Sequence, residues 1–160
     1  MASFDELDFK LRTFMKFYRY RCYDTTPHTP LQRPLAECRV ALVTTAGLHT
    51  ASQEPFDDHF RGGDYSYREI PNTADVQVLT IAHKSTAYDQ TGSFADRNLV
   101  FPLDRFRELE QGDKIGQLND RHFSFMGSLT APGRLIKHTA PEVGQILKSD
   151  GVDVAFLTPV

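Results

Sequence analysis

Two short apolar runs constrain the fold of this chain most. Val40–Val43 is the first, and Val154–Leu157, which follows a helical pattern near the last residue, is the second. Strands that are apolar on both faces are typical of parallel sheets, because helices cover both sides of such a sheet. The two runs therefore predict buried parallel strands over residues 39–45 and 152–160.

The pattern of the whole chain predicts an α/β protein. A helical segment comes first, and strand and helix patterns then alternate, which favours a mainly parallel sheet flanked by helices in Rossmann-like or flavodoxin-like layers. Besides the two strands above, strands or short apolar pieces are expected over 65–70, 76–82, 115–118 and 123–126. Loops are expected over 48–63, 84–98 and 127–133.

Three helices are expected from apolar residues at helical spacing. A capping box of Ser3 and Glu6 predicts a helix over 4–20, and apolar residues before Gly112 predict another over 103–112.

The third predicted helix has both of its ends marked. Thr139 and Glu142 form a second capping box, and Gly151 fits the end of the helix.

The 160 residues suit one domain with a real core. We predict a single α/β domain over 1–160, in which 1–37 form an N-terminal helix and a proline-rich extended arm over 24–34, and 38–160 form the core.

Composition argues against several classes of function. The formal net charge is −3 and no basic face is clustered, so nucleic-acid binding is not expected. No apolar stretch reaches the roughly 18 residues that span a bilayer, and the start of the chain does not resemble a signal peptide. These observations predict a cytoplasmic protein that binds no membrane. Cys22 and Cys38 are far apart and are expected to be free thiols.

The end of the last predicted strand is the first place to look for a site. Ligands in open α/β sheets bind just beyond the carboxyl ends of the strands. The strand over 152–160 ends at Val160, the last residue of this sequence, so we expect a site to begin there. The loop after the strand over 39–45 ends at the same edge, and Gly47 and His49 in it are candidates to approach a ligand or to transfer a proton. An ordinary turn remains the alternative.

Three other groups of residues are weaker candidates. Asp64, Tyr65 and Arg68 could hold a carboxylate or ammonium group, although the favoured explanation is an edge strand whose charges, Glu69 included, are solvated and form an internal ion pair. Polar loop residues near Asp89 and Asp96 could form a substrate-facing loop, although a hydrogen-bonded connector is the favoured explanation. A metal site is not expected, because no ligand motif spaces the scattered side chains of His49, Asp57, Asp58, His59, His83 and His122.

Six segments in register resemble one family. They are Val40–His49, Gly63–Pro71, His83 with Tyr88–Asp89, Asp96–Gln111, Phe123–Ser128 and the terminal segment 150–160. In order and spacing they resemble the selenoprotein B family of the glycine, sarcosine and betaine reductases, with the greatest likeness to the D-proline reductase selenoprotein subunit. The resemblance covers about residues 38–160 and leaves the N-terminal helix outside.

The resemblance implies a reductase that cleaves a C–N bond of an amino acid or amine. A pyruvoyl group in a partner subunit holds the substrate, a selenolate or thiolate attacks the α-carbon, and a second thiol resolves the product. The family nucleophile, a selenocysteine or cysteine, would directly follow Val160. We therefore expect this polypeptide to be inactive as a reductase, because it lacks that nucleophile. Either a UGA codon read as a stop or an artificial boundary would explain such an end. No cofactor is expected within the chain, whereas reductase partner subunits and a homo-oligomer are expected partners.

Matching positions suggest which residues lie near the substrate. They are Thr45, Gly47, His49, Asp64, Arg68, Glu69, His83, Asp89, Asp96 and Phe125. Arg68 suits a substrate carboxylate, which its planar fork binds in bidentate fashion, and His49 or His83 suits proton transfer. Two other readings stay open: a non-catalytic α/β binding or assembly module, and a metal-dependent hydrolase.

Overall fold

The computed structural model describes residues 6–18, 22, 24–83, 85 and 88–160. By its internal contacts the chain divides into two compact units, Met1–Pro30 and Leu31–Val160, and each is described by itself. Whether the whole chain acts as one domain stays a prediction.

The first unit contains helix α1, Phe9–Phe17. Its N-cap is Asp8, whose carboxylate accepts hydrogen bonds from the backbone N–H groups of Lys10 and Leu11. The helix thus begins later than the predicted residue 4. Ser3 of the predicted capping box lies outside the described residues.

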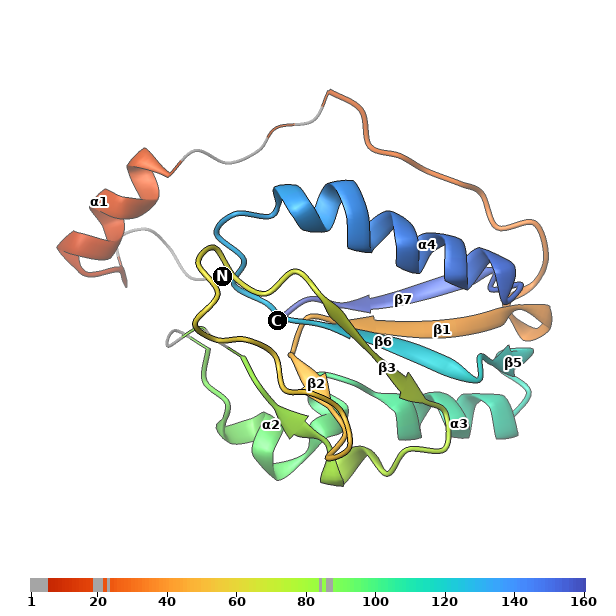
Figure 1. The fold of residues 1–160 in the computed structure, drawn as a ribbon. Coiled ribbons are helices and arrows are strands. Elements are labelled where there is room, and N and C mark those ends of the chain that lie inside the picture. Colours follow the sequence, from red (N-terminus) through yellow and green to blue (C-terminus); the bar gives the residue numbers. More distant parts are fainter. Residues whose placement is uncertain (1–5, 19–21, 23, 84, 86–87) are drawn as a thin grey trace. The chain divides into compact units, whose positions relative to one another are not determined.

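The second unit is built on a five-stranded mixed sheet (Figure 1). Its strands are β1 Arg39–Thr44, β3 Tyr67–Pro71, β5 Gln117–Leu118, β6 Arg121–Phe125 and β7 Val154–Thr158. β1 pairs in parallel with β5, β6 and β7, whereas β3 runs antiparallel to β6. The predicted α/β class is confirmed. A mainly parallel sheet in Rossmann-like or flavodoxin-like layers is not confirmed, because the sheet is mixed.

A small second sheet corrects the prediction for residues 76–82. Val76–Val78 form a 3-10 turn, η3, because the Asp75 side chain accepts from the N–H of Gln77, and only β4, Thr80–Ile81, is a strand. β4 pairs antiparallel with β2, Leu48–His49, inside a predicted loop. The predicted loop over 84–98 likewise contains α2, Thr91–Ala95, and part of η4, Arg97–Leu99.

Two longer helices cover the sheet. α3, Leu103–Gln111, is confirmed, with Gly112 as its C-cap. α4, Ala140–Ser149, continues without a break from a π-helical turn, η5 Leu135–Thr139. The capping box predicted for α4 is wrong, since Thr139 has helical backbone angles and its hydroxyl donates to the Tyr65 carbonyl. Gly151 does follow the helix end, with a positive φ of 73°.

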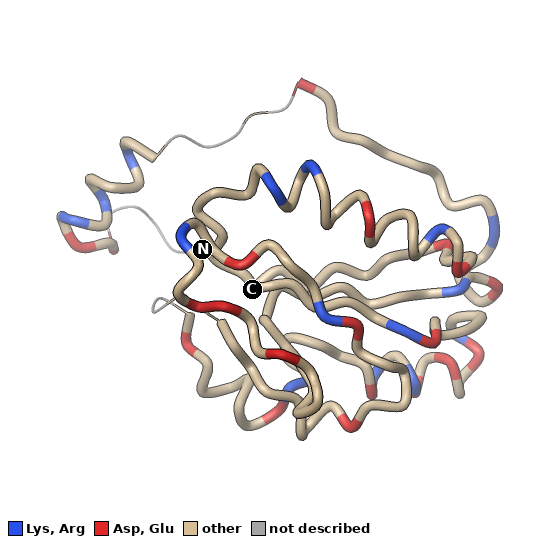
Figure 2. The backbone as a smooth tube through the Cα atoms, in the orientation of Figure 1, with Lys and Arg blue, Asp and Glu red and all other residues tan. Residues whose placement is uncertain are grey.

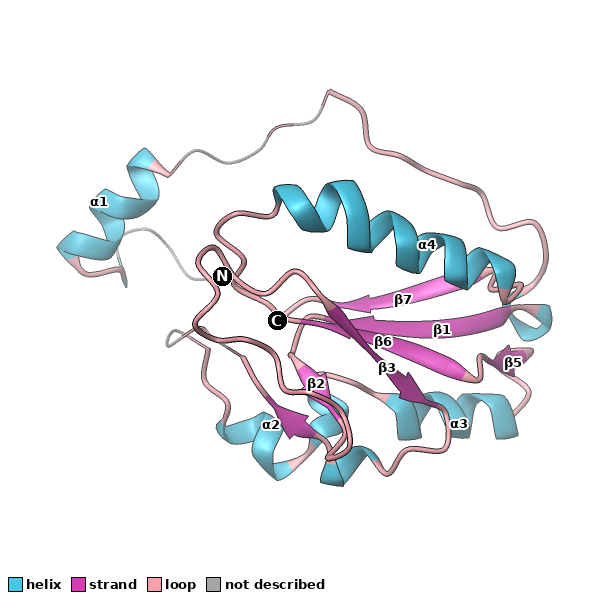
Figure 3. Ribbon diagram, in the orientation of Figure 1, coloured by secondary structure: helices cyan, strands magenta, loops and turns pink. Residues whose placement is uncertain are grey.

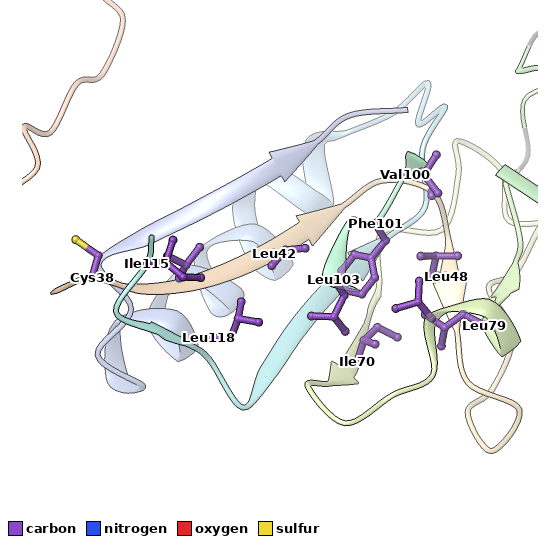
Figure 4. Close-up of a cluster of buried hydrophobic side chains, with 13 residues drawn as sticks. Cys38, Leu42, Leu48, Ile70, Leu79, Val100, Phe101, Leu103, Ile115 and Leu118 are labelled. Carbon is purple, nitrogen blue, oxygen red and sulfur yellow. The ribbon is translucent and has the colours of Figure 1, made fainter. Parts of the chain in front are cut away.

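The helices lie on opposite faces of the sheet, α4 on one and α3 on the other (Figure 3). Ala41 and Phe123 pack with Val143 of α4 on the first face. Leu42 and Leu103 belong to the larger cluster on the second face (Figure 4). Alternating side chains of β1 therefore enter both cores, as its apolar run predicts.

β7 departs from the prediction in one respect. It is parallel to β1, in register from Val40 with Val154 to Thr44 with Thr158. It is not buried, because β1 is its one partner among the described strands, and Leu157 is 65% exposed. An edge strand loses the cover that a central strand has on both sides.

Within the described part of the chain, no helix is long and apolar enough to cross a membrane.

Candidate functional site

Threonine side chains tie the carboxyl ends of β1 and β7 together. The hydroxyls of Thr44 and Thr158 both donate to the Val100 carbonyl, at 2.8 and 2.9 Å. The Val160 N–H donates to the Thr45 hydroxyl at 2.8 Å, and that hydroxyl lies 3.3 Å from the Val160 carbonyl oxygen. The position that follows β7 is therefore held against the end of β1.

Two adjoining cavities open at this edge of the sheet. One, of about 280 Å³, is lined by Thr45, Phe125, Met126, Gly127, Ser128, Leu129, Pro132, Leu135, Ala140 and Val160. The other, of about 340 Å³, is lined by His83, Ser85, Tyr88, Ser128 and Val160. They share Ser128 and Val160, and none of the described residues that line them carries a fixed charge. The carboxyl edge thus offers a mainly apolar site, as position in the fold predicts.

His83 supplies the polar group in the wall of this site. Its Nδ1 accepts from the Ser85 N–H at 3.1 Å, so the proton of the neutral ring sits on Nε2. Nε2 is buried and has no hydrogen-bond partner among the described residues. Burial lowers the pKa of His83, an effect that the Val160 backbone opposes. The imidazole is therefore neutral, and its Nε2–H is buried close to Gly127 and interacts at most weakly with the Val160 backbone.

Glycine is required at two positions around His83. A Cβ on Gly127 would collide with His83 Nε2 and lie 2.8 Å from the Thr45 carbonyl oxygen. A Cβ on Gly47 would lie 2.5 Å from the Ala82 carbonyl oxygen, and Gly47 also has a positive φ of 69°. These glycines let the chain before His83 and the end of β6 pack against the end of β1.

His49 and His83 border a third cavity of about 550 Å³. His49 is buried, and its Nδ1 lies 3.0 Å from the Thr50 carbonyl oxygen. Of the predicted site residues, Thr45, Gly47, His49, His83 and Phe125 thus come together around the ends of β1 and β6.

Asp64 and Arg68 organise the loop before β3. The Asp64 carboxylate accepts hydrogen bonds from the N–H groups of Asp57 and Ser66 and from the Ser66 hydroxyl. Burial alone would raise the pKa of Asp64, but these hydrogen bonds outweigh burial and lower it. Arg68 donates to the carbonyls of Glu54 and Pro55. These bonds direct the Arg68 guanidinium to the loop backbone. Its role in binding a substrate carboxylate stays a prediction.

The remaining predicted residues lie away from the cavities. Glu69 pairs with Arg121 at 3.3 Å, toward the start of β6. Asp89 is exposed and accepts from the Thr91 N–H, which lowers its pKa. Asp96 is exposed and accepts from the Gln77 side chain and from the Asn98 N–H, which lowers its pKa. These three predictions remain untested.

The buried cysteine of the second unit does not line the cavities. Cys38 is buried directly before β1, at the opposite end of the sheet, and burial with nearby Asp153 raises the pKa of its thiol despite Arg33. Cys22 belongs to the first unit and is exposed. Among the described residues there is also no group of three or more His, Cys, Asp or Glu side chains placed to hold a metal ion.

Sequence reasoning missed part of the cavity wall. Leu129, Pro132, Leu135 and Ala140 come from a predicted loop and from a helix that starts earlier than predicted. They are small or apolar, so their residue types carried no chemical signal. Only the position of the Gly127–Gly133 segment after β6 pointed to this edge.

The geometry defines an α/β protein with a mainly apolar site at the carboxyl ends of its parallel strands. The chain belongs to the glycine/sarcosine/betaine reductase selenoprotein B family, whose pattern matches residues 9–160. The match includes α1, which the resemblance over 38–160 had left outside.

Named relatives support the same family. The chain is 35% identical to D-proline reductase subunit gamma of Acetoanaerobium sticklandii over 130 residues, which are 81% of this chain and 52% of that protein. It is 31% identical to glycine reductase complex component B subunit gamma of Symbiobacterium thermophilum, over 88% of this chain and 33% of that protein. It is 26% identical to sarcosine reductase complex component B subunit beta of Peptoclostridium acidaminophilum, over 88% and 32%.

The chain thus spans about half the length of the first of these relatives and about a third of the other two. No solved structure matches the chain.

Proposed function

We propose that this chain is a selenoprotein B-like subunit of an amino-acid or amine reductase of the glycine, sarcosine, betaine or D-proline type. The observation that carries the proposal is the cavity pair at the carboxyl ends of β1, β6 and β7, with the unpartnered Nε2–H of His83 in its wall. A selenolate or thiolate placed there displaces nitrogen from carbon, and a dithiol supplies the two electrons of the reduction.

The residues present fit such a nucleophile. A thiolate is stabilised by a nearby N–H donor, and His83 Nε2 offers one that no described group uses. Thr45 holds Val160 through its hydroxyl, so a group that follows β7 is aimed at the cavities. The adjoining cavity is lined mainly by apolar residues, and a low local polarity strengthens the hydrogen bond that a thiolate accepts.

Departure of the amine needs a proton. Cleavage of the C–N bond leaves the electron pair on nitrogen, which must gain a proton to depart as an amine. Solvent supplies that proton, because a neutral imidazole that gave up its N–H would become an imidazolate. His83 instead donates a hydrogen bond to a group in the cavity of about 340 Å³ beside Tyr88, whose ring packs edge-on against the imidazole with the ring centroids 4.8 Å apart.

The proposal includes partner subunits and a reducing compartment. The relatives are named as subunits or components of reductase complexes, which favours a multi-subunit assembly for this chain, with a pyruvoyl group on a partner. We also propose a homo-oligomer, and the cytoplasm as the compartment, since a catalytic thiolate or selenolate must stay reduced.

The positions of the cysteines predict how residues 1–160 behave alone. Cys38 is buried at the far end of the sheet, so its thiol does not reach the cavities, and Cys22 belongs to the first unit. We expect this polypeptide with a dithiol and D-proline or glycine to give no reduction. Measurable turnover would contradict the assignment of the nucleophile to the position after β7.

A cysteine placed in the cavity tests whether the site activates a thiol. Ser128 lines both cavities, so Ser128→Cys puts a thiol beside His83. Its alkylation by iodoacetamide at pH 7 should be about tenfold faster than that of exposed Ser52→Cys, because a thiol pKa lowered by about one unit gives that ratio.

The double variant Ser128→Cys/His83→Gln separates activation from simple exposure. We expect its alkylation to slow to the rate of the Ser52→Cys control. Equal rates with and without His83 would remove the catalytic role of the edge and favour the alternative, a non-catalytic assembly module.

A further inference from the structure

The cavity of about 550 Å³ lies on the other side of His83 from the proposed nucleophile position. It is lined by His49, Pro55, Phe56, Asp58, Thr80, Ile81, Ala82 and His83. Its volume is within the range of sites for small molecules, roughly 300–1,000 Å³. Because His83 borders this cavity and the one beside Val160, a ligand here would lie one side chain away from the end of β7.

His49 turns an acceptor toward this cavity. The side chain is only 6% exposed, and its Nδ1 lies 3.0 Å from the Thr50 carbonyl oxygen. A carbonyl only accepts, so Nδ1 must carry the proton and Nε2 of the neutral ring bears a lone pair. Nε2 has no hydrogen-bond partner among the described residues and belongs to a residue that lines the cavity.

The other groups in the wall also lack positive charge. Asp58 adds a carboxylate that is 67% exposed and lies 3.3 Å from the imidazole Nε2 of its neighbour His59, and no Lys or Arg is among the described lining residues. Arg68 contacts the wall from behind: its Nε and Nη2 donate to the carbonyls of Glu54 and Pro55 at 2.7 and 3.0 Å, and its guanidinium stacks on the Phe56 ring at 4.3 Å. Its donors are therefore directed to the loop.

We infer that this cavity binds the ammonium group of a small organic amine through His49 Nε2 and the Asp58 carboxylate. Two acceptors, one of them negatively charged, complement a cationic donor, whereas a carboxylate or phosphate would be repelled. The inference deepens the proposed function and rests on it for the source of the amine: the nitrogen end of the substrate or the amine that is released.

Equilibrium binding tests the inference without any turnover. The probes are butylammonium and pyrrolidinium, with butyrate and butan-1-ol as controls of matched size. We expect both ammonium probes to shift the ¹⁵N resonance of His49 Nε2 in the unmodified protein, and the two controls to leave it unchanged. Butyrate or butanol acting as strongly as butylammonium, or no shift with either ammonium, would overturn the inference.

Variants locate the site. His49→Phe should weaken butylammonium binding at least tenfold and Asp58→Asn several-fold. His138→Gln replaces an exposed imidazole in η5 that does not line this cavity, so it should leave binding unchanged. Equal affinity in the His49 variant would contradict the site; if that variant does not fold, the ¹⁵N shift of the unmodified protein still decides.

The two proposals fail in different experiments. Loss of amine binding with intact activation of the Ser128→Cys thiol by His83 refutes only the ammonium site. Amine binding without thiol activation supports the ammonium site and refutes the catalytic role of the neighbouring edge.

Discussion

The two ends of the sheet differ in how their polar groups are used. At the end where β1 and β7 begin, Arg121 donates to both Asp150 oxygens at 2.8 Å and pairs with Glu69, while Arg39 donates to Gln117. At the other end, the two adjoining cavities have no charged side chain among their described lining residues. Figure 2 shows charged positions gathered near the beginnings of β1 and β7.

This difference indicates that the charged end of the sheet stabilises the fold and that the cavity end is the place for ligand binding. Charges at the amino end are paired with one another, so they hold strands and the end of α4 in place and leave little for a ligand. The carboxyl end keeps a donor on His83 and an acceptor on His49 that no described residue satisfies. Such unmatched groups cost stability in a fold and are typical of sites that bind something else.

The largest expected effect lies between the two ends, at His122 in β6. Its Nδ1 accepts from the Leu42 N–H at 3.1 Å, and burial lowers its pKa to about 4 from 6.5. The neutral ring is needed in the fold, so stability is complete above pH 6.5 and falls by about 3 kcal/mol as the pH drops toward 4. Urea unfolding at pH 7, 5 and 4 measures this slope.

His122→Asn keeps an acceptor and removes the titration. Its stability should change much less over the same pH range, whereas the exposed His59→Gln control should keep the slope. Identical slopes for His122→Asn and the unmodified protein would place the pH dependence elsewhere.

The next effect tests the charged end. Hydrogen bonds from Arg121 lower the pKa of Asp150 to about 2. The stability that this pair adds is present above about pH 4 and is lost as the pH falls toward 2. Asp150→Asn should therefore cost about 1–2 kcal/mol at pH 7, discounted for partial solvent screening, by urea unfolding. Asp113→Asn, in an exposed turn with φ 53°, should cost under about 0.5 kcal/mol.

A smaller effect is expected for Gly127→Ala at the cavity end. The added methyl group must displace the His83 ring or the Thr45 backbone, at about 1 kcal/mol. Displacement of the ring toward solvent should raise the pKa of His83 toward its ordinary value, measured by NMR titration. Gly144→Ala in α4 has open space and should not move that pKa. An unchanged His83 titration in Gly127→Ala would show that the ring is not held against Gly127.

The smallest effect sharpens the contrast. His83→Gln should change stability by less than about 0.5 kcal/mol, because Nε2 makes no hydrogen bond within the described protein and the Gln side-chain oxygen can accept from the Ser85 N–H in place of Nδ1. The same substitution is expected to abolish thiol activation in Ser128→Cys. A large loss of stability, seen as a lower midpoint in thermal unfolding, would make His83 a structural residue.

Some elements were predictable because their signals are local. The apolar run of β1, the periodic α3 and the glycine after α4 each appear in the expected place. Residues 76–82 were wrongly predicted as one strand, since a single side chain, Asp75, caps a tight turn there. The predicted capping box at Thr139 failed because its hydroxyl has a partner in a distant segment, Tyr65.

The candidate site divides in the same way. Gly47 and His49 follow the first strand, so their place at the carboxyl edge was predictable from the rule for open α/β sheets. Arg68 was predicted to bind a substrate carboxylate because of its residue type alone. Only the structure shows that its donors are directed to the loop carbonyls.

By itself the sequence determined the α/β class, the family and the edge of the sheet at which to look, because periodicity, segment order and strand direction are encoded locally. Tertiary structure alone decided which histidines keep an unused nitrogen at a cavity and which charges neutralise one another. Those properties depend on partners far apart in the chain, such as Gly127 beside His83 and Arg121 beside Asp150, whose proximity exists only after folding.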